Sequence, residues 1–209
     1  MPRYLGGADK RYVWFDTEYS DLELETAWLL QVSALITDTS LKRILPQEQD
    51  VRLAIRLPDQ AVLSLWVEQN LSDLVQACRS SGAVSMDEAD ARLVDYVNAA
   101  ARLPAELENQ RPVLAGNSLH SDWWLVRRYL PHFLSCLHYR HLDVTAFKLE
   151  WQCLHPHEEF EKENPEIIHR YFPEAVLPMS GGRHDAYYDV QASVAELAFY
   201  RRFLFHKGI

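Results

Sequence analysis

Two acidic side chains end an otherwise apolar stretch near the start of the chain. Residues Tyr12 to Glu18 read Tyr-Val-Trp-Phe-Asp-Thr-Glu, so Asp16 and Glu18 are two positions apart. In a strand such positions face the same side, which would bring the two carboxylates together. Like charges that close raise each other's pKa unless a divalent metal or a basic group neutralises them. The stretch predicts a buried strand with a cation site at its end, and the alternative is a solvated strand end at a sheet edge.

Further candidate residues lie far along the chain. Asp122 follows a predicted strand, where it could reach the end of a sheet, although an acid at a helix N-terminus is also favoured by the helix dipole alone. His184 and Asp189 are five positions apart, which in a regular helix separates them by roughly 140°. They can face one site only if His184 lies in the loop before the helix, and Gly181 and Gly182 favour such a loop. Alone, His184 is also typical of a surface or capping residue.

The elements that would position these residues alternate between strands and helices. Strands are expected at 12–18 and 27–37, with one or two short strands within 41–45 and 51–55, and further strands at 113–116 and 139–144. A helix is expected from Pro58 to about 78, and a second begins at a capping box of Ser85 and Glu88 and runs to about 97. A third is expected from Asp122, capped by Ser121, to 129. Two more are expected at 145–154 and 185–205. This order indicates an α/β fold.

Length and composition set limits on the architecture. The chain has 209 residues, 48% of them apolar, which suffices for one sizeable core. We expect residues 1–11 to be a flexible lead and residues 12–207 to form one domain. Within that domain, residues 155–178 hold four prolines and six glutamates and are expected to be an irregular insertion that could contain one short helix.

Charge and cysteine content limit the class of protein. A formal charge of -9 argues against coating long DNA or RNA through a basic field, but it allows a small nucleic-acid substrate held by metal. Cys78, Cys136 and Cys153 form no Cys-x-x-Cys pair, so we expect neither a disulfide framework nor a thiolate zinc site, which suits a reducing cytoplasm. No window approaches the roughly 20 apolar residues of a membrane helix. A protein that is soluble and not secreted is therefore expected.

Taken together, these motifs resemble the DEDDh family of 3′-to-5′ exonucleases, and within it the oligoribonuclease-like members. The resemblance is carried by the Asp-x-Glu strand, by Gly116-Asn117-Ser118 with Asp122, by the run 138–144, and by His184 and Asp189 with the run 193–201. It implies a ribonuclease H-like fold, a mixed five-stranded sheet flanked by helices, whose first three strands are antiparallel. It also implies a homodimer that acts on short single-stranded RNA, including dinucleotides.

The resemblance assigns roles to four acidic residues and one histidine. Asp16, Glu18, Asp122 and Asp189 would hold two Mg²⁺ or Mn²⁺ ions, and His184 would be the general base. Carboxylates suit these hard cations, and a pair of such ions can activate an attacking water and stabilise the departing 3′ oxygen. The expected products are nucleoside 5′-monophosphates.

The resemblance also assigns substrate contacts. Leu22 matches a wedge between the two terminal bases and Trp66 an aromatic that stacks on a base, although both could equally belong to the core. Ser118, Tyr139 and Arg140 match residues that a second subunit contributes to cap the 5′ phosphate of a dinucleotide.

The sequence departs from the family pattern near these contacts. Leu71 stands where a phosphate-cap histidine is expected, and His120 and Ser121 replace the usual Gly-Gln before Asp122. The departures leave the preference for dinucleotides open and do not affect the metal chemistry. The alternatives are a relative that acts on short DNA or on longer chains, and a non-catalytic module that binds nucleic-acid ends.

Overall fold

The structure is a computed structural model that describes residues 10–101, 111–177 and 185–204. Its strands are β1 Arg11–Tyr19, β2 Leu29–Asp38, β3 Val51–Ala54, β4 Val113–Gly116 and β5 His141–Asp143. Its α-helices are α1 Leu65–Asn70, α2 Ser72–Arg79, α3 Met86–Ala101, α4 His120–Tyr129, α5 Pro131–Cys136, α6 Thr145–Leu154, α7 Pro165–Tyr171 and α8 Ala186–Leu204. Each helix within these ranges is too short or too polar to cross a membrane.

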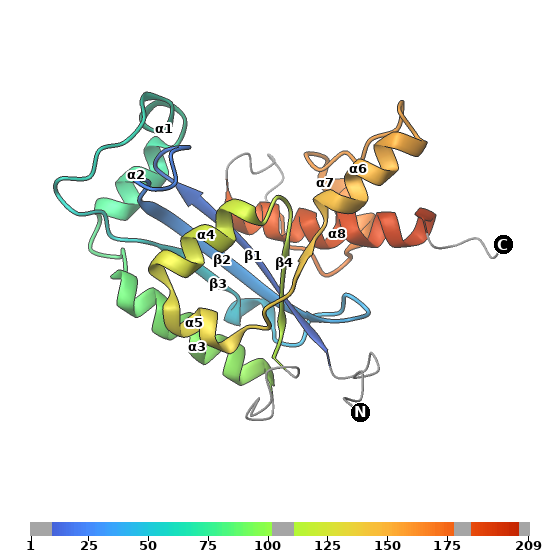
Figure 1. The fold of residues 1–209 in the computed structure, drawn as a ribbon, viewed down its shortest axis with the longest axis horizontal. Coiled ribbons are helices and arrows are strands. Elements are labelled where there is room, and N and C mark those ends of the chain that lie inside the picture. The colour runs from blue at the N-terminus through green and yellow to red at the C-terminus, as the bar shows by residue number, and fades with distance from the viewer. Residues whose placement is uncertain (1–9, 102–110, 178–184, 205–209) are drawn as a thin grey trace.

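The five strands form one mixed sheet in the order β3-β2-β1-β4-β5 (Figure 1). β1, β2 and β3 pair antiparallel, whereas β4 pairs parallel with β1 and β5 parallel with β4. The strand with the Asp-x-Glu motif is therefore the central strand, and the alternative of a sheet-edge position is wrong. Its apolar residues Val13, Trp14 and Phe15 are buried, as expected for a strand covered on both faces.

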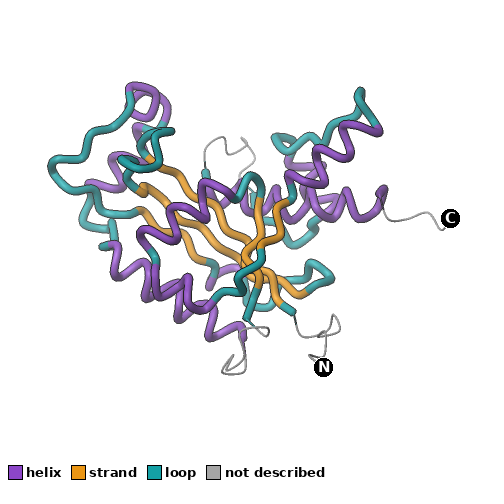
Figure 2. Tube along the Cα trace, in the orientation of Figure 1, coloured by secondary structure: helices purple, strands orange, loops and turns teal. Residues whose placement is uncertain are grey.

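Helices cover both faces of the sheet, because alternate residues of β1 point to opposite sides. Val13 and Phe15 pack in a core with residues of α3, α4 and α5. Trp14 faces the other way, into a core built with α6, α7 and α8. Figure 2 shows the strands between these two helical layers. A smaller cluster joins α1 and α2 to Leu30 of β2.

Several predicted element boundaries are wrong. The single helix expected from Pro58 is two short helices, α1 and α2, that meet at Leu71, and Pro58 lies in a loop. α4 begins at His120 without a side-chain cap, so Ser121 lies inside the helix and does not cap it. α5 was not predicted. Of the one or two short strands expected within 41–45 and 51–55, one forms, β3, while Arg43 makes an isolated bridge to Thr37.

Other local predictions are confirmed in whole or in part. The Ser85 hydroxyl accepts a hydrogen bond from the Glu88 amide (3.2 Å) at the start of α3, while the Glu88 carboxylate pairs with Arg92 instead of returning to the cap. α6 has the predicted bounds. The described part of the predicted insertion, residues 155–177, contains one short helix, α7, which packs against α8. Residues 1–9 of the predicted lead lie outside the described residues.

Candidate active site

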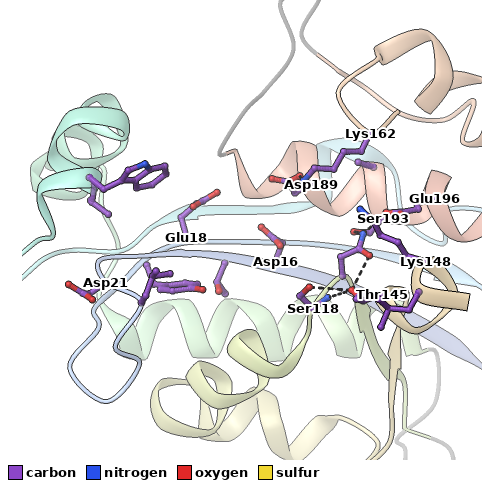
Figure 3. Close-up of a pocket in the computed structure, with 18 of the residues that line it drawn as sticks. Asp16, Glu18, Asp21, Ser118, Thr145, Lys148, Lys162, Asp189, Ser193 and Glu196 are labelled. Carbon is purple, nitrogen blue, oxygen red and sulfur yellow. Dashed lines mark hydrogen bonds and ion pairs between the residues drawn. The ribbon is translucent and has the colours of Figure 1, made fainter. Parts of the chain in front are cut away.

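Three carboxylates meet at the carboxyl end of β1. One oxygen each from Asp16, Glu18 and Asp189 lies within 4.8 Å of the others, and Figure 3 shows these side chains turned toward a common space. Asp16 and Glu18 point to the α8 face of β1, and Asp189 lies in the first turn of α8. β1 and β2 shift register between Glu18 and Tyr19, an irregularity common beside active sites. The structure therefore brings these three predicted site residues together.

Asp122 lies beside this group rather than within it. Its Oδ1 accepts a hydrogen bond of 2.6 Å from the Thr17 hydroxyl. Thr17 is between the two acids in sequence and points to the opposite face of β1, the face that α4 covers. Asp122 therefore approaches the strand end from the α4 side, and a hollow lined by both Asp16 and Asp122 joins the two sides. We call Asp16, Glu18, Asp122 and Asp189 the acidic wall.

The acidic wall is electrostatically costly without a cation. Burial, followed by the charges of Asp122, Asp189 and Glu18, holds the pKa of Asp16 well above its ordinary value. Burial, with Asp189 the largest neighbouring charge, raises the pKa of Glu18 to about 7. Burial also raises the pKa of Asp122 to about 7, against the hydrogen bond from Thr17. Raised values at several neighbouring acids are typical of a site whose positive partner arrives from solution.

The residues present fit a hard divalent cation. Three converging carboxylate oxygens are the ligand type that Mg²⁺, Mn²⁺ and Ca²⁺ prefer. Ser33 is the antiparallel partner of Asp16, and its buried hydroxyl has no hydrogen-bond partner among the described residues. Such an orphaned polar atom is usually explained by an ordered water or ion.

A tight turn carries β4 into α4 and so sets the position of Asp122. A side chain at Gly116 would place its Cβ 2.7 Å from the Phe15 carbonyl oxygen, so this close approach of β4 to β1 requires glycine. Ser118 adopts a positive φ of 51°. Its amide donates to Asp143 Oδ1 (3.1 Å) and to the Thr145 hydroxyl (2.8 Å), and the Leu119 amide donates to Asp143 Oδ2 (3.2 Å). The Asp143 carboxylate therefore stabilises the turn.

A cavity of about 760 Å³ opens in front of the acidic wall. Leu22 and Trp66 also line this cavity and are 87% and 48% exposed, so neither belongs to the core. With Tyr19 they form what we call the apolar rim. Ser118 also lines the cavity. The structure thus brings Leu22, Trp66 and Ser118 to the same hollow as three of the acids.

Tyr139 and Arg140 are not among the described residues that line the cavity. They precede β5, whose His141 pairs with Leu114 near the amino end of the parallel strands, whereas the acids lie at the carboxyl end of β1. Tyr139 is 59% exposed, and the Arg140 guanidinium lies 5.3 Å from the centre of its ring. His184 lies outside the described residues, so its predicted position stays a prediction.

Sequence reasoning missed several residues around the acids. Thr17 carried a usable signal, because strand alternation places it on the face opposite its two acidic neighbours. Asp143 lies within the run 138–144 that resembles the family, but no local pattern indicates that its carboxylate binds the Ser118 turn. Lys162, whose ammonium lies 3.2 Å from Asp189 Oδ1, gave no signal, because its segment has no regular period.

Solved structures with a similar fold are exonucleases. Exonuclease I from Methylocaldum szegediense matches 94% of this chain with a TM-score of 0.65 at 16% identity, and exonuclease I from E. coli, solved with an oligonucleotide, matches 93% with a TM-score of 0.64 at 15% identity. The chain spans 41% of each of those proteins. At this identity the likeness concerns the fold, and it confirms the ribonuclease H-like architecture.

Relatives in sequence are matched over most of their length, although the chain matches no family model. It is 29% identical to human mitochondrial oligoribonuclease over 96% of this chain and 76% of the relative. It is 31% identical to the oligoribonuclease of Nocardia farcinica over 95% of this chain and 82% of the relative, and 31% identical to that of Mycobacterium tuberculosis over 92% and 80%. Sequence, fold and acidic wall agree, and the chain belongs to the oligoribonuclease family.

Proposed function

We propose that this protein is a metal-dependent 3′-to-5′ exonuclease that hydrolyses short oligoribonucleotides, including dinucleotides, to nucleoside 5′-monophosphates. The observation that carries the proposal is the convergence of Asp16, Glu18 and Asp189 within 4.8 Å in a chain whose relatives are named oligoribonuclease. The cavity supports short substrates, because its volume of about 760 Å³ is in the range of small-ligand pockets.

We assign two divalent ions, Mg²⁺ or Mn²⁺, to the acidic wall. Asp16, Glu18 and Asp189 would hold them from the α8 side, and Asp122, oriented by Thr17, from the α4 side. When bound, such ions supply Lewis-acid activation of the attacking water and charge stabilisation at the departing 3′ oxygen. With a net charge of -9, the protein repels phosphates by its overall field, so these cations are needed to attract the substrate.

The remaining proposed roles belong to the chain's own groups. His184 takes a proton from the attacking water at a ring nitrogen, as a general base. Leu22 and Trp66 hold the terminal bases at the apolar rim, where stacking on an aromatic ring tolerates any base. Ser118 contributes a hydroxyl to the same cavity, beside the hydroxyl of Thr145 (3.2 Å).

We propose that the active form is a homodimer, in which Tyr139 and Arg140 of one copy cap the 5′ phosphate bound by the other. Their distance from the acids along the strands supports a contribution to a second copy rather than to their own cavity. Size-exclusion chromatography with light scattering would test the dimer. Arg140→Ala should weaken cleavage of dinucleotides more than that of heptamers, whereas equal loss on both lengths would contradict a phosphate cap.

A direct assay tests the reaction. 5′-labelled RNA and DNA of two to about ten nucleotides would be incubated with Mg²⁺ or with chelator, beside Asp189→Asn and His184→Ala variants. We expect metal-dependent shortening of RNA from the 3′ end that both variants abolish or strongly reduce. Cleavage of DNA alone would replace RNA by short DNA as the substrate. No metal-dependent shortening of any substrate would favour a module that only binds nucleic-acid ends.

We also propose a cytoplasmic location. Cys78, Cys136 and Cys153 are all free thiols, as expected in a reducing compartment. The human relative is named a mitochondrial protein, whereas the Nocardia relative carries no such term in its name. Fractionation of the source cells followed by immunoblotting would decide between compartments.

A further inference from the structure

One lysine from the segment between α6 and α7 reaches the acidic wall. The Lys162 ammonium lies 3.2 Å from Asp189 Oδ1, and Figure 3 shows its side chain extending to Asp189. Lys148 also lines the cavity, but its ammonium pairs with Glu159 at 3.5 Å rather than with an acid of the wall. The two lysines therefore share one cavity and differ in their partners.

The backbone of Lys162 is fixed by the core rather than by the ion pair. The Tyr188 hydroxyl donates to the Lys162 carbonyl oxygen (3.0 Å), and the Lys162 amide donates to the Phe160 carbonyl oxygen (3.0 Å). Phe160 is buried and packs against Phe199 of α8, with ring centres 5.6 Å apart. Tyr188 precedes Asp189 on α8. The helix that carries Asp189 therefore also binds the backbone of the loop that carries Lys162.

Lys162 brings a positive charge to the converging acids. Its ammonium lies 3.2 Å from Asp189 Oδ1, and an oxygen of Asp189 lies within 4.8 Å of an oxygen of Asp16 and of Glu18. The ammonium therefore lies where a divalent cation would also be attracted by the three carboxylates.

We propose that Lys162 is the resident cation of the acidic wall in the metal-free protein, and that a metal ion has to displace its ammonium from Asp189 to bind there. The inference rests on the proposed metal-dependent function. The segment between α6 and α7, which carries Lys162, would then lower the metal affinity of the site by a modest factor. A metal ion and an ammonium cannot share one carboxylate oxygen without repulsion, so occupancy by one disfavours the other.

Metal titration of the full chain tests this competition. Mn²⁺ and Mg²⁺ affinities would be measured by calorimetry for the wild type, Lys162→Met, Lys162→Arg and the control Lys148→Met. The Lys162 and Asp189 side chains are 52% and 25% exposed, so the expected effect is modest. We expect Lys162→Met to bind metal about three- to fivefold more tightly, since partly exposed pairs contribute up to about that factor. Lys162→Arg and Lys148→Met should stay close to the wild-type affinity.

A second measurement separates the inference from a general charge effect. In chelator, Lys162→Met should melt at a lower temperature than Lys148→Met, because only the former loses the cation that neutralises the wall. Equal or weaker metal affinity in Lys162→Met would overturn the inference, and so would equal gains in both methionine variants. A wild-type protein that binds no metal would instead overturn the proposed function. If Lys162→Met does not fold, Lys162→Gln provides the same comparison with a polar side chain.

Discussion

The acidic and the apolar parts of the cavity lining are built in opposite ways. The acidic wall stands on the central strand and on two helices that pack against it, and its carboxylates are held by the core beneath them. The apolar rim consists of Leu22 in a loop and Trp66 in the six-residue helix α1, both with large exposed surfaces. The acidic wall holds mutually repelling carboxylates on rigid elements of the core. The apolar rim presents exposed apolar side chains on a loop and a short helix.

This difference suggests a division of labour. Metal chemistry requires ligands fixed to within fractions of an ångström, which sheet and helix positions supply. Base stacking tolerates different bases and some movement, which suits exposed residues on short elements. The wall should therefore control the rate of hydrolysis and the rim the affinity for substrate.

The largest expected effect is at the centre of the wall. Asp16→Asn should lower the rate by about a thousandfold, because metal binding contributes several kcal/mol to transition-state stabilisation. The same change should raise the melting temperature in chelator, because it removes a carboxylate whose ionisation is opposed by burial and by neighbouring acids. Rates and melting curves measured together check both effects. A lower melting temperature would show that activity is lost through misfolding.

A smaller effect is expected one contact away from the wall. Thr17→Val removes the hydroxyl that holds Asp122 and should lower the rate by about ten- to a hundredfold, as is usual for groups that orient metal ligands. Thr17→Ser keeps the hydroxyl and should retain most of the activity. Steady-state kinetics at several metal concentrations would check the pair. Equal activity in both variants would mean that the hydrogen bond does not position Asp122.

The rim should respond in affinity rather than in rate. Trp66→Ala should raise KM about tenfold with little change in kcat, since stacking on one base contributes about 1–3 kcal/mol. Leu65→Ala is a matched control, because Leu65 is on the same helix, is exposed and is not among the cavity-lining residues. A fall in kcat without a change in KM would contradict the proposed division between wall and rim.

The smallest expected effect is a pH dependence of stability in the metal-free protein. The pKa of Glu18 is raised from 4.5 to about 7 by folding. A raised carboxyl pKa stabilises the fold below the unfolded value, and this stabilisation is lost as pH rises toward and through 7. Melting temperatures in chelator should therefore fall by a few degrees between pH 5 and pH 8. This fall in melting temperature should be smaller in Glu18→Gln. A fall of the same size in that variant would show that other groups cause the pH dependence.

The sequence indicated the acids of β1 and most of the order of elements, apart from α5 and the division between α1 and α2, because these features depend on local periodicity. Buried residues at Val13 to Phe15 followed by Asp16 and Glu18 make a pattern that can be recognised without distant contacts. Boundaries that depend on packing were missed, as at Leu71, where the predicted helix divides into α1 and α2.

Only the tertiary structure decided how the acids are partnered. The bond from Thr17 to Asp122 joins residues 105 positions apart, and the ion pair of Lys162 with Asp189 joins residues 27 positions apart. Neither pair leaves a periodic trace in the sequence, because the meeting point depends on how β1, α4 and α8 pack. The sequence by itself predicted a cation site at the end of β1, since neighbouring carboxylates on one strand face repel, and it left a solvated strand end as the alternative. Packing determined which acid lies on which face and which lysine stands among them.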